Sequence, residues 1–234
     1  NLSVEKVSEE IVDIKEIMPQ TASFQINYEV EIPYEGKREN YLVTEYYRIR
    51  YTSDRIYLLD FEREMSQLFD EKKNIYNGNK ISLGIQGTDQ VRLMECDGGN
   101  IFAFVVGNRL FSYNVADNKL ALLFSFQDED NHDRRTIYDE HTIKVLNVDE
   151  AGNVQFVVYG YMNRGRHEGE NGVQVNYYNS SQNTIEELVF VPYTKSPELL
   201  EQDISKLSFA GSNGRFYMMM DSTIHEMNLS SRQR

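Results

Sequence analysis

The densest group of side chains that could do chemistry is the run DEDNHD at residues 128–133. Its carboxylate and amide oxygens are the ligands that Ca²⁺ prefers in proteins, but the central glycine and terminal glutamate of an EF-hand loop are both missing. Two interpretations follow: a calcium site held by Asp128, Asp130 and Asp133, or an ordinary solvated loop between strands. The sequence predicts no other cofactor.

A second polar group is the run NRGRHEGE at residues 163–170, which follows an apolar segment rich in tyrosine. Arginine, histidine and tyrosine side chains hydrogen-bond to, and stack on, protein or carbohydrate ligands. The alternative is a solvated hairpin tip after a strand whose tyrosines are packing residues. The predicted ligand-binding residues are Tyr159, Tyr161, Arg164, Arg166 and His167.

Covalent catalysis leaves no local pattern in this chain. The Gly-x-Ser-x-Gly turn of many hydrolases is missing, and the single cysteine, Cys96, has no histidine near it in sequence. Cys96 is therefore predicted to be a core thiol. The paired carboxylates of glycoside hydrolases come from distant strands, so a carbohydrate-active hydrolase or lyase stays an alternative.

The net charge of the chain limits the kinds of partner that it is expected to bind. The 234 residues contain 24 Lys and Arg against 37 Asp and Glu, a formal net charge of -13. Such a chain repels polyanions unless its basic residues cluster, and the basic pairs 72–73 and 134–135 stand next to carboxylates. No nucleic-acid partner is expected. No apolar run approaches the ~20 residues of a membrane span, although an anchor upstream of Asn1 is compatible with a chain that does not begin with Met.

The stretch from Asn100 to Phe126 shows what kind of scaffold positions these groups. Its three apolar runs are separated by Gly107-Asn108 and Asp117-Asn118. Such pairs supply the positive φ of a tight hairpin turn. The run from Ile101 to Val106 is apolar at every position, which is typical of a strand whose sheet is covered on both faces. Together with the apolar run before Asp97, the stretch predicts a four-stranded antiparallel meander.

The same pattern recurs along the chain. An aliphatic residue is followed three positions later by a large apolar residue and then by Asn or Asp, at uneven spacings that are compatible with loop insertions. The segment from Asn114 to Phe124 also aligns without a gap with the segment from Asn179 to Val189, which places Leu120 over Ile185. The four copies of the pattern are Ile56–Phe61, Leu110–Val115, Val175–Ser180 and Ile224–Leu229.

These repeated meanders resemble the blades of β-propellers, in which each sheet packs face to face on its neighbours. The resemblance covers the chain from about residue 21 onward and is generic, because the Trp-Asp dipeptide of one large family is missing together with all Trp. It implies an all-β array of about four antiparallel four-stranded blades in residues 21–234. The alternatives are a fragment of a larger propeller and a β-sandwich.

The N-terminal segment, residues 1–20, is predicted to complete the last blade. That blade ends after its third strand, so one of its edges needs a partner. Propellers commonly close by pairing one terminus with the last blade, which here means residues 2–14 on Ile224–Leu229.

The sequence thus favours a non-enzymatic binding or scaffolding module with a protein or carbohydrate ligand. Rigid sheets that carry polar loops suit such a role. The predicted location is extracytoplasmic, as the exposed part of a bacterial envelope protein, and the alternative is the cytoplasm.

The calcium interpretation can be tested by heating. If Asp128, Asp130 and Asp133 bind Ca²⁺, millimolar Ca²⁺ should raise the melting temperature, because the ion binds the folded chain preferentially. A variant with Asn at all three positions should lose the response. Identical melting curves with Ca²⁺ and with chelator would eliminate the calcium site.

Overall fold

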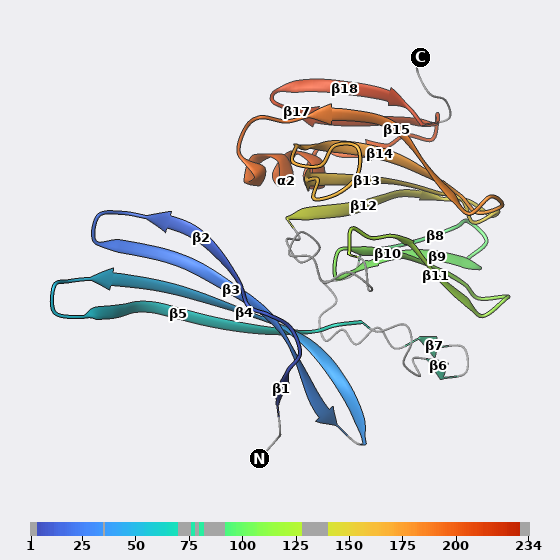
Figure 1. The fold of residues 1–234 in the computed structure, drawn as a ribbon. Helices are drawn as coiled ribbons and strands as arrows, with labels where there is room; N and C mark the ends of the chain where they lie inside the picture. Colours follow the sequence, from blue (N-terminus) through green and yellow to red (C-terminus); the bar gives the residue numbers. More distant parts are fainter. Residues whose placement is uncertain are drawn as a thin grey trace. The chain divides into compact units, whose positions relative to one another are not determined.

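The fold was analysed in a computed structural model that describes residues 4–34, 36–69, 76–77, 80–81, 92–127 and 140–229. Figure 1 shows a chain made of antiparallel sheets, and its contacts divide it into two compact units, residues 1–86 and 87–234. The one described helix, α2 (Pro197–Lys206), spans 10 residues. Among the described residues, therefore, no helix has the length and apolar character needed to cross a membrane.

The first unit is built on a five-stranded sheet in the order β1-β3-β4-β5, in which β2 also pairs with β3. The long hairpin of β3 and β4 keeps one register from Thr21 opposite Arg50 to Tyr34 opposite Lys37. Apart from the short ribbon of β6 and β7, every described element of this unit belongs to the sheet. The strands are β1 (Glu5–Lys6), β2 (Ile11–Ile17), β3 (Thr21–Tyr34), β4 (Lys37–Tyr51), β5 (Ile56–Gln67), β6 (Tyr76–Asn77) and β7 (Lys80–Ile81).

The second unit contains three antiparallel sheets, β8 to β11, β12 to β15 and β16 to β18. Each is a meander in which strands that are consecutive in sequence pair with each other, as the sequence predicts. The strands are β8 (Arg92–Glu95), β9 (Ile101–Val106), β10 (Arg109–Asn114), β11 (Lys119–Phe124), β12 (His141–Val148), β13 (Val154–Tyr161), β14 (Asn171–Asn179), β15 (Thr184–Pro192), β16 (Ser208–Ala210), β17 (Arg215–Met220) and β18 (Thr223–Asn228).

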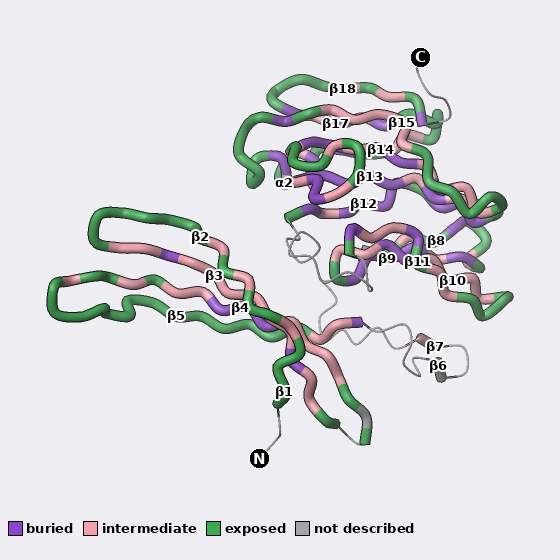
Figure 2. Tube along the Cα trace, in the orientation of Figure 1, coloured by how far each residue is buried: buried purple, intermediate pink, exposed green. Residues whose placement is uncertain are grey.

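The middle sheet of this unit has a hydrophobic core against each face, and its strands β12 to β14 are largely buried, whereas β15 is not (Figure 2). Alternate residues of β13 point to opposite faces, so Phe156 joins the core shared with β9 and β12, while Val157 joins the core shared with β17 and α2. Both side chains are fully buried. Complete burial of such a side chain contributes about 2 kcal/mol, which explains why this strand is apolar at nearly every position.

The repeat between the first two sheets of the second unit is confirmed in detail. Asn118 and Asn183 both adopt a positive φ in the turn after the third strand, at 49° and 51° respectively. Each accepts a hydrogen bond from the tyrosine five residues earlier, Tyr113 at 2.7 Å and Tyr178 at 3.0 Å. The sequence alignment therefore identified equivalent turns.

The following strands repeat the same irregularity. The register of β10 with β11 skips Leu123, and the register of β14 with β15 skips Leu188. Leu123 aligns with Leu188 in the sequence comparison. One extra residue at equivalent positions is a β-bulge, a local feature that bends the strand and increases its twist.

The coarse prediction, an all-β chain with antiparallel sheets of about four strands, is confirmed. The described residues contain four such sheets of three to five strands and no closed propeller. The first sheet departs from the predicted repeat, because Ile56–Phe61 begins β5 and this strand continues to Gln67. The other three copies end β10, β14 and β18 at an asparagine. A propeller-like arrangement of the sheets stays a prediction.

Part of the N-terminal segment pairs within the first sheet. Glu5 of β1 pairs opposite Glu31, and Ile11 of β2 pairs opposite Asn27, so both strands lie on the edge of β3. Between them, Ser8 accepts a hydrogen bond from the N–H of Glu29 at 2.8 Å. Completion of the last blade by residues 2–14 stays a prediction.

The C-terminal end of α2 is held by a lysine from β12. The Nζ of Lys144 donates to the carbonyl oxygens of Ile204 at 3.0 Å, Ser205 at 3.3 Å and Ser208 at 2.7 Å. The last carbonyls of a helix have no partner within it, and their partial negative charge attracts a cation. Lys144 thus ties α2 to the middle sheet.

Lys144→Met should loosen this helix while leaving the sheets folded. Loss of this partly buried donor removes hydrogen bonds from the carbonyls of Ser205 and Ser208, at a cost of about 2 kcal/mol. Hydrogen exchange of the α2 amides should therefore become roughly thirtyfold faster. Lys206→Met is the control, because Lys206 is exposed at the same end of α2. Equal exchange rates in both variants would contradict the assigned role of Lys144.

Candidate functional site

One face of the first sheet carries apolar side chains in rows that cross the strands. Residues paired across a ladder point to the same face, so the registers define which side chains are neighbours. The first row is Ile17, Ala22, Ile49 and Leu58, from β2, β3, β4 and β5. The second row is Ile14, Phe24, Tyr47 and Phe61, from the same strands in the same order.

Two further rows extend this surface toward the other end of the sheet. They are Val12, Ile26, Glu45 and Arg63, followed by Tyr28, Val43 and Met65. We call the surface made by these four rows the apolar face.

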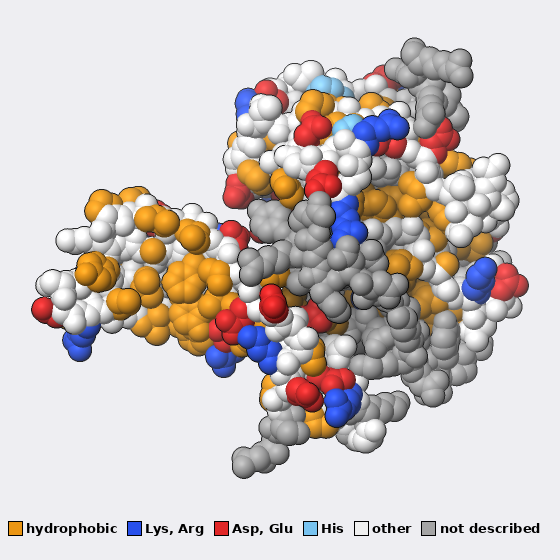
Figure 3. All heavy atoms as spheres, in the orientation of Figure 1, with side chains coloured by type: hydrophobic (Ala, Val, Ile, Leu, Met, Phe, Trp, Pro, Cys, Tyr) orange, Lys and Arg blue, Asp and Glu red, His pale blue; other side chains and the backbone are white. Residues whose placement is uncertain are grey.

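Much of the apolar face is exposed. Ile17 is 71% exposed, Ile14 60% and Leu58 59%. Figure 3 shows hydrophobic side chains gathered over β2 to β5. Soluble proteins seldom leave apolar patches of several hundred Å² uncovered unless the patch contacts a partner. The only other described sheet of the first unit is the ribbon of β6 and β7, which has two residues in each strand and is too short to cover the four rows.

The second row contains three aromatic rings in contact. The rings of Phe24 and Tyr47 are stacked at 5.2 Å with an interplanar angle of 15°, and those of Tyr47 and Phe61 are tilted at 5.0 Å. Aromatic pairs at such distances contribute about 1 kcal/mol beyond the burial of their area. They stiffen the middle of the apolar face.

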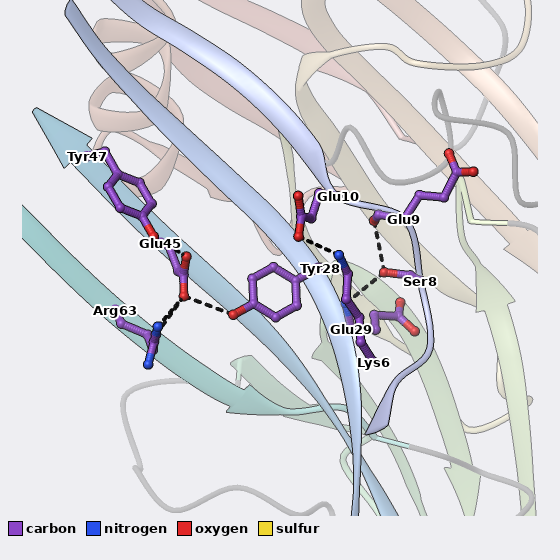
Figure 4. Close-up of polar contacts among 9 residues, drawn as sticks. All are labelled: Lys6, Ser8, Glu9, Glu10, Tyr28, Glu29, Glu45, Tyr47 and Arg63. Atoms are coloured by element: carbon purple, nitrogen blue, oxygen red, sulfur yellow. Dashed lines mark hydrogen bonds and ion pairs between the residues drawn. The ribbon is translucent and has the colours of Figure 1, made fainter. Parts of the chain in front are cut away.

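A carboxylate lies beside these rings, on the third row. Figure 4 shows Glu45 pointing toward side chains from three strands. Its Oε1 accepts hydrogen bonds from the Tyr28 hydroxyl at 2.9 Å and the Arg63 Nε at 2.7 Å. Its Oε2 accepts from the Tyr47 hydroxyl at 2.6 Å. Glu45 is only 6% exposed, so its charge is neutralised inside the apolar face and not displayed on it.

These contacts shift the proton affinities of the cluster. Burial opposes ionisation of Glu45, but the hydrogen bonds from Tyr47, Tyr28 and Arg63 outweigh it and lower the pKa of the carboxyl. The hydrogen bond to Glu45 is also the main cause that raises the pKa of Tyr47. Burial, followed by the hydrogen bond to Glu45, raises the pKa of Tyr28. At neutral pH the carboxylate is therefore ionised and both phenols remain donors.

The ligand-binding residues predicted from sequence lie in the second unit. Tyr159 is in a core and donates to the Oε1 of Glu201 at 3.2 Å. The His167 ring stacks on Phe190 at 3.7 Å, and its Nε2 lies 3.1 Å from Glu187.

The other members of this set are closer to the surface. Arg166 is exposed and reaches Glu187 at 3.9 Å, so it meets His167 at one carboxylate. Tyr161 and Arg164 are half-buried. The structure thus brings Arg166 and His167 together, and a ligand role for the five residues stays a prediction.

The predicted calcium ligands Asp128, Asp130 and Asp133 lie outside the described residues. Among the residues that the structure does describe, no group of three or more His, Cys, Asp or Glu is placed to hold a metal ion. The predicted core thiol is confirmed, because Cys96 is a free cysteine that is 1% exposed.

Sequence reasoning missed the apolar face as a site. The repeated pattern led to an interpretation of residues 21–234 as an array of similar blades, in which no one sheet face stands out. The signal that could have found the face is the coincidence of alternating apolar residues in β2, β3 and β4 within one unit.

Comparison with known proteins adds no family to this description. No protein-family model matches the chain, and the search of curated proteins finds no significant match.

Glu45→Gln should destabilise the protein in a pH-dependent way. Loss of the charged acceptor should lower the free energy of unfolding by about 2 kcal/mol at pH 7. Because the folded pKa lies below the unfolded value of about 4.3, the carboxylate contributes its full stability above that value and loses it as the pH falls through the folded pKa. Urea unfolding at pH 7 and at acidic pH should therefore show a difference that shrinks on acidification.

Glu64→Gln provides the control for this measurement, because Glu64 is an exposed carboxylate on the neighbouring strand. It should change stability little at any pH. If Glu45→Gln lowers the free energy of unfolding by the same amount at pH 7 and below the folded pKa of Glu45, the hydrogen bonds to the ionised carboxylate are not the cause of the lost stability.

Proposed function

We propose that this protein is a non-enzymatic binding module and that the apolar face of the first sheet holds a partner protein. The observation that carries the proposal is the exposure of aliphatic side chains from two non-adjacent strands, β2 and β5, on one face of the sheet. Covering such a face removes apolar area from water at roughly 25 cal/mol per Å². The sheet itself is preorganised, so little ordering is required on binding.

A protein suits this face better than a carbohydrate. Sugar sites combine an aromatic platform with polar groups that are free to hydrogen-bond to hydroxyls. Here the polar groups next to the rings, Glu45, Tyr28 and Arg63, bond to one another. The remaining surface is mainly aliphatic, as the core of a protein interface is.

The proposed function includes a propeller-like scaffold and a location in the bacterial envelope. A propeller-like array of sheets in the second unit would provide a rigid support, and an exposed position in the bacterial envelope would give the face access to partners. No described feature favours the alternative of a carbohydrate-active hydrolase or lyase. Surface digestion of intact cells with a protease that does not enter them would test the location.

A photoreactive residue tests the binding role directly. Benzoylphenylalanine introduced at Leu58, in the first row of the apolar face, should give one discrete covalent adduct when the native cells are irradiated. The same residue at Tyr57 is the matched control, since Tyr57 pairs with Arg50 and points to the opposite face of the same strand. It should give no adduct of that mass.

A second test of the binding role places a charge on the apolar face. Ile14→Glu should lower the yield of the Leu58 adduct at least tenfold, because an unpaired carboxylate would be buried under the partner. Adducts of equal yield from positions 57 and 58, or no adduct from position 58, would refute the proposed function.

A further inference from the structure

Among the described strands, β5 is an edge strand of the first sheet. β5 pairs with β4 along one side, and no other pairing of β5 occurs among the described strands. Every residue from Ile56 to Ser66 is exposed. In an edge strand, alternate residues direct their N–H and C=O groups away from the sheet, where they form a template for another strand.

The usable part of this edge is Asp60–Gln67. Opposite Arg48 and Ile49 the register skips Leu59, so Leu59 is the extra residue of a bulge. A bulge interrupts regular pairing, whereas the segment after it pairs without a break from Asp60 to Gln67.

The two faces of this segment differ in chemistry. Phe61, Arg63 and Met65 point to the apolar face, where Arg63 already pairs with Glu45. Asp60, Glu62 and Glu64 point to the opposite, polar face.

Two of these carboxylates lack a cation opposite them in the described sheet. Glu62 pairs across the ladder with Tyr46, and Glu64 with Thr44, while Asp60 alone faces an arginine, Arg48. Glu62 and Glu64 therefore form an acidic row along the free edge, spaced by about 7 Å as alternate residues of a strand are.

We propose that β5 adds an extended strand of the partner protein, with basic residues opposite Glu62 and Glu64 and apolar residues opposite Phe61 and Met65. This inference rests on the proposed function and names the form of the partner. Backbone hydrogen bonds to the edge would provide affinity, and the alternating side chains would provide specificity. The apolar residues of the added strand would extend the apolar face by one strand.

Charge complementarity favours such a partner over a second copy of this chain. Antiparallel pairing of β5 with itself about Arg63 would place Glu62 of one copy opposite Glu64 of the other, twice. Like charges directly opposite each other destabilise a strand pair. A basic strand instead gains an opposite-charge pair at each position.

A synthetic peptide long enough to pair with Asp60–Gln67, alternating arginine with valine and labelled with a dye, provides the probe. It should bind the full chain in a fluorescence polarisation titration and slow the hydrogen exchange of the β5 amides. A peptide with glutamate in place of every arginine should not bind. Equal binding of both peptides, or no slowing of exchange in residues 60–67, would overturn the proposal.

Backbone pairing is tested with N-methylated peptides, which keep every side chain. Methylation of one alternate set of amides removes the donors that face β5 and should abolish binding. Methylation of the other set should leave binding within about twofold of the parent peptide. If both methylated peptides bind as the parent does, strand addition is wrong.

The acidic row is tested on the chain itself. Glu62→Gln with Glu64→Gln should weaken peptide binding by roughly threefold at low salt, since each exposed charge pair contributes a few tenths of a kcal/mol. Glu9→Gln with Glu16→Gln is the control variant, because it removes the same number of exposed charges away from β5, and it should not change the affinity. An equal loss in both variants would mean that the net charge of the chain, and not the acidic row, attracts the peptide.

The two proposals fail in different ways. If position 58 gives its adduct but the arginine peptide neither binds nor protects β5, the binding module stands and strand addition is overturned. If neither experiment succeeds, both are overturned.

Discussion

The constraint on which this structure depends is that an apolar sheet face must be covered. In the second unit the middle sheet meets the requirement on both sides, with Phe156 in one core and Val157 in the other. Both faces of β13 can therefore be apolar. The first sheet has the same kind of face in a unit whose only other described elements are β6 and β7. Its aliphatic rows remain exposed, and this difference between the two units is what points to a partner.

The Glu45 cluster shows how an apolar face can contain a charge. An isolated carboxylate at 6% exposure would cost several kcal/mol, because it loses its hydration. Tyr28, Tyr47 and Arg63 replace that hydration with three donors from three strands. The arrangement is satisfied only in the observed register. A shift of one residue would turn these side chains to opposite faces, so the cluster specifies the pairing of β3, β4 and β5.

The parts of the fold that depend on local sequence could be predicted. The turn at Asn118 and its repeat at Asn183 follow from residues that tolerate a positive φ, and the ungapped alignment predicts that the two segments are equivalent. The bulges at Leu123 and Leu188 were not predicted, because an alignment does not show where a ladder is irregular. Contacts between segments that are distant in the sequence could not be predicted. Lys144 reaches α2 across about sixty residues, and Glu45 meets donors from two other strands. Neither leaves a local pattern, because each exists only after the strands have paired.

The pattern of β5 also explains how a binding edge can avoid aggregation. Edge strands that are long and apolar pair indiscriminately, and proteins commonly protect them with charged residues. In β5 the charges of Glu62 and Glu64 lie on the polar face and leave the backbone accessible. They repel a second copy, which carries the same charges, and attract a basic strand. Glu62 and Glu64 thus disfavour pairing with a second copy of this chain and favour pairing with a basic strand. Specific binding often combines attraction to the correct partner with repulsion of the wrong one.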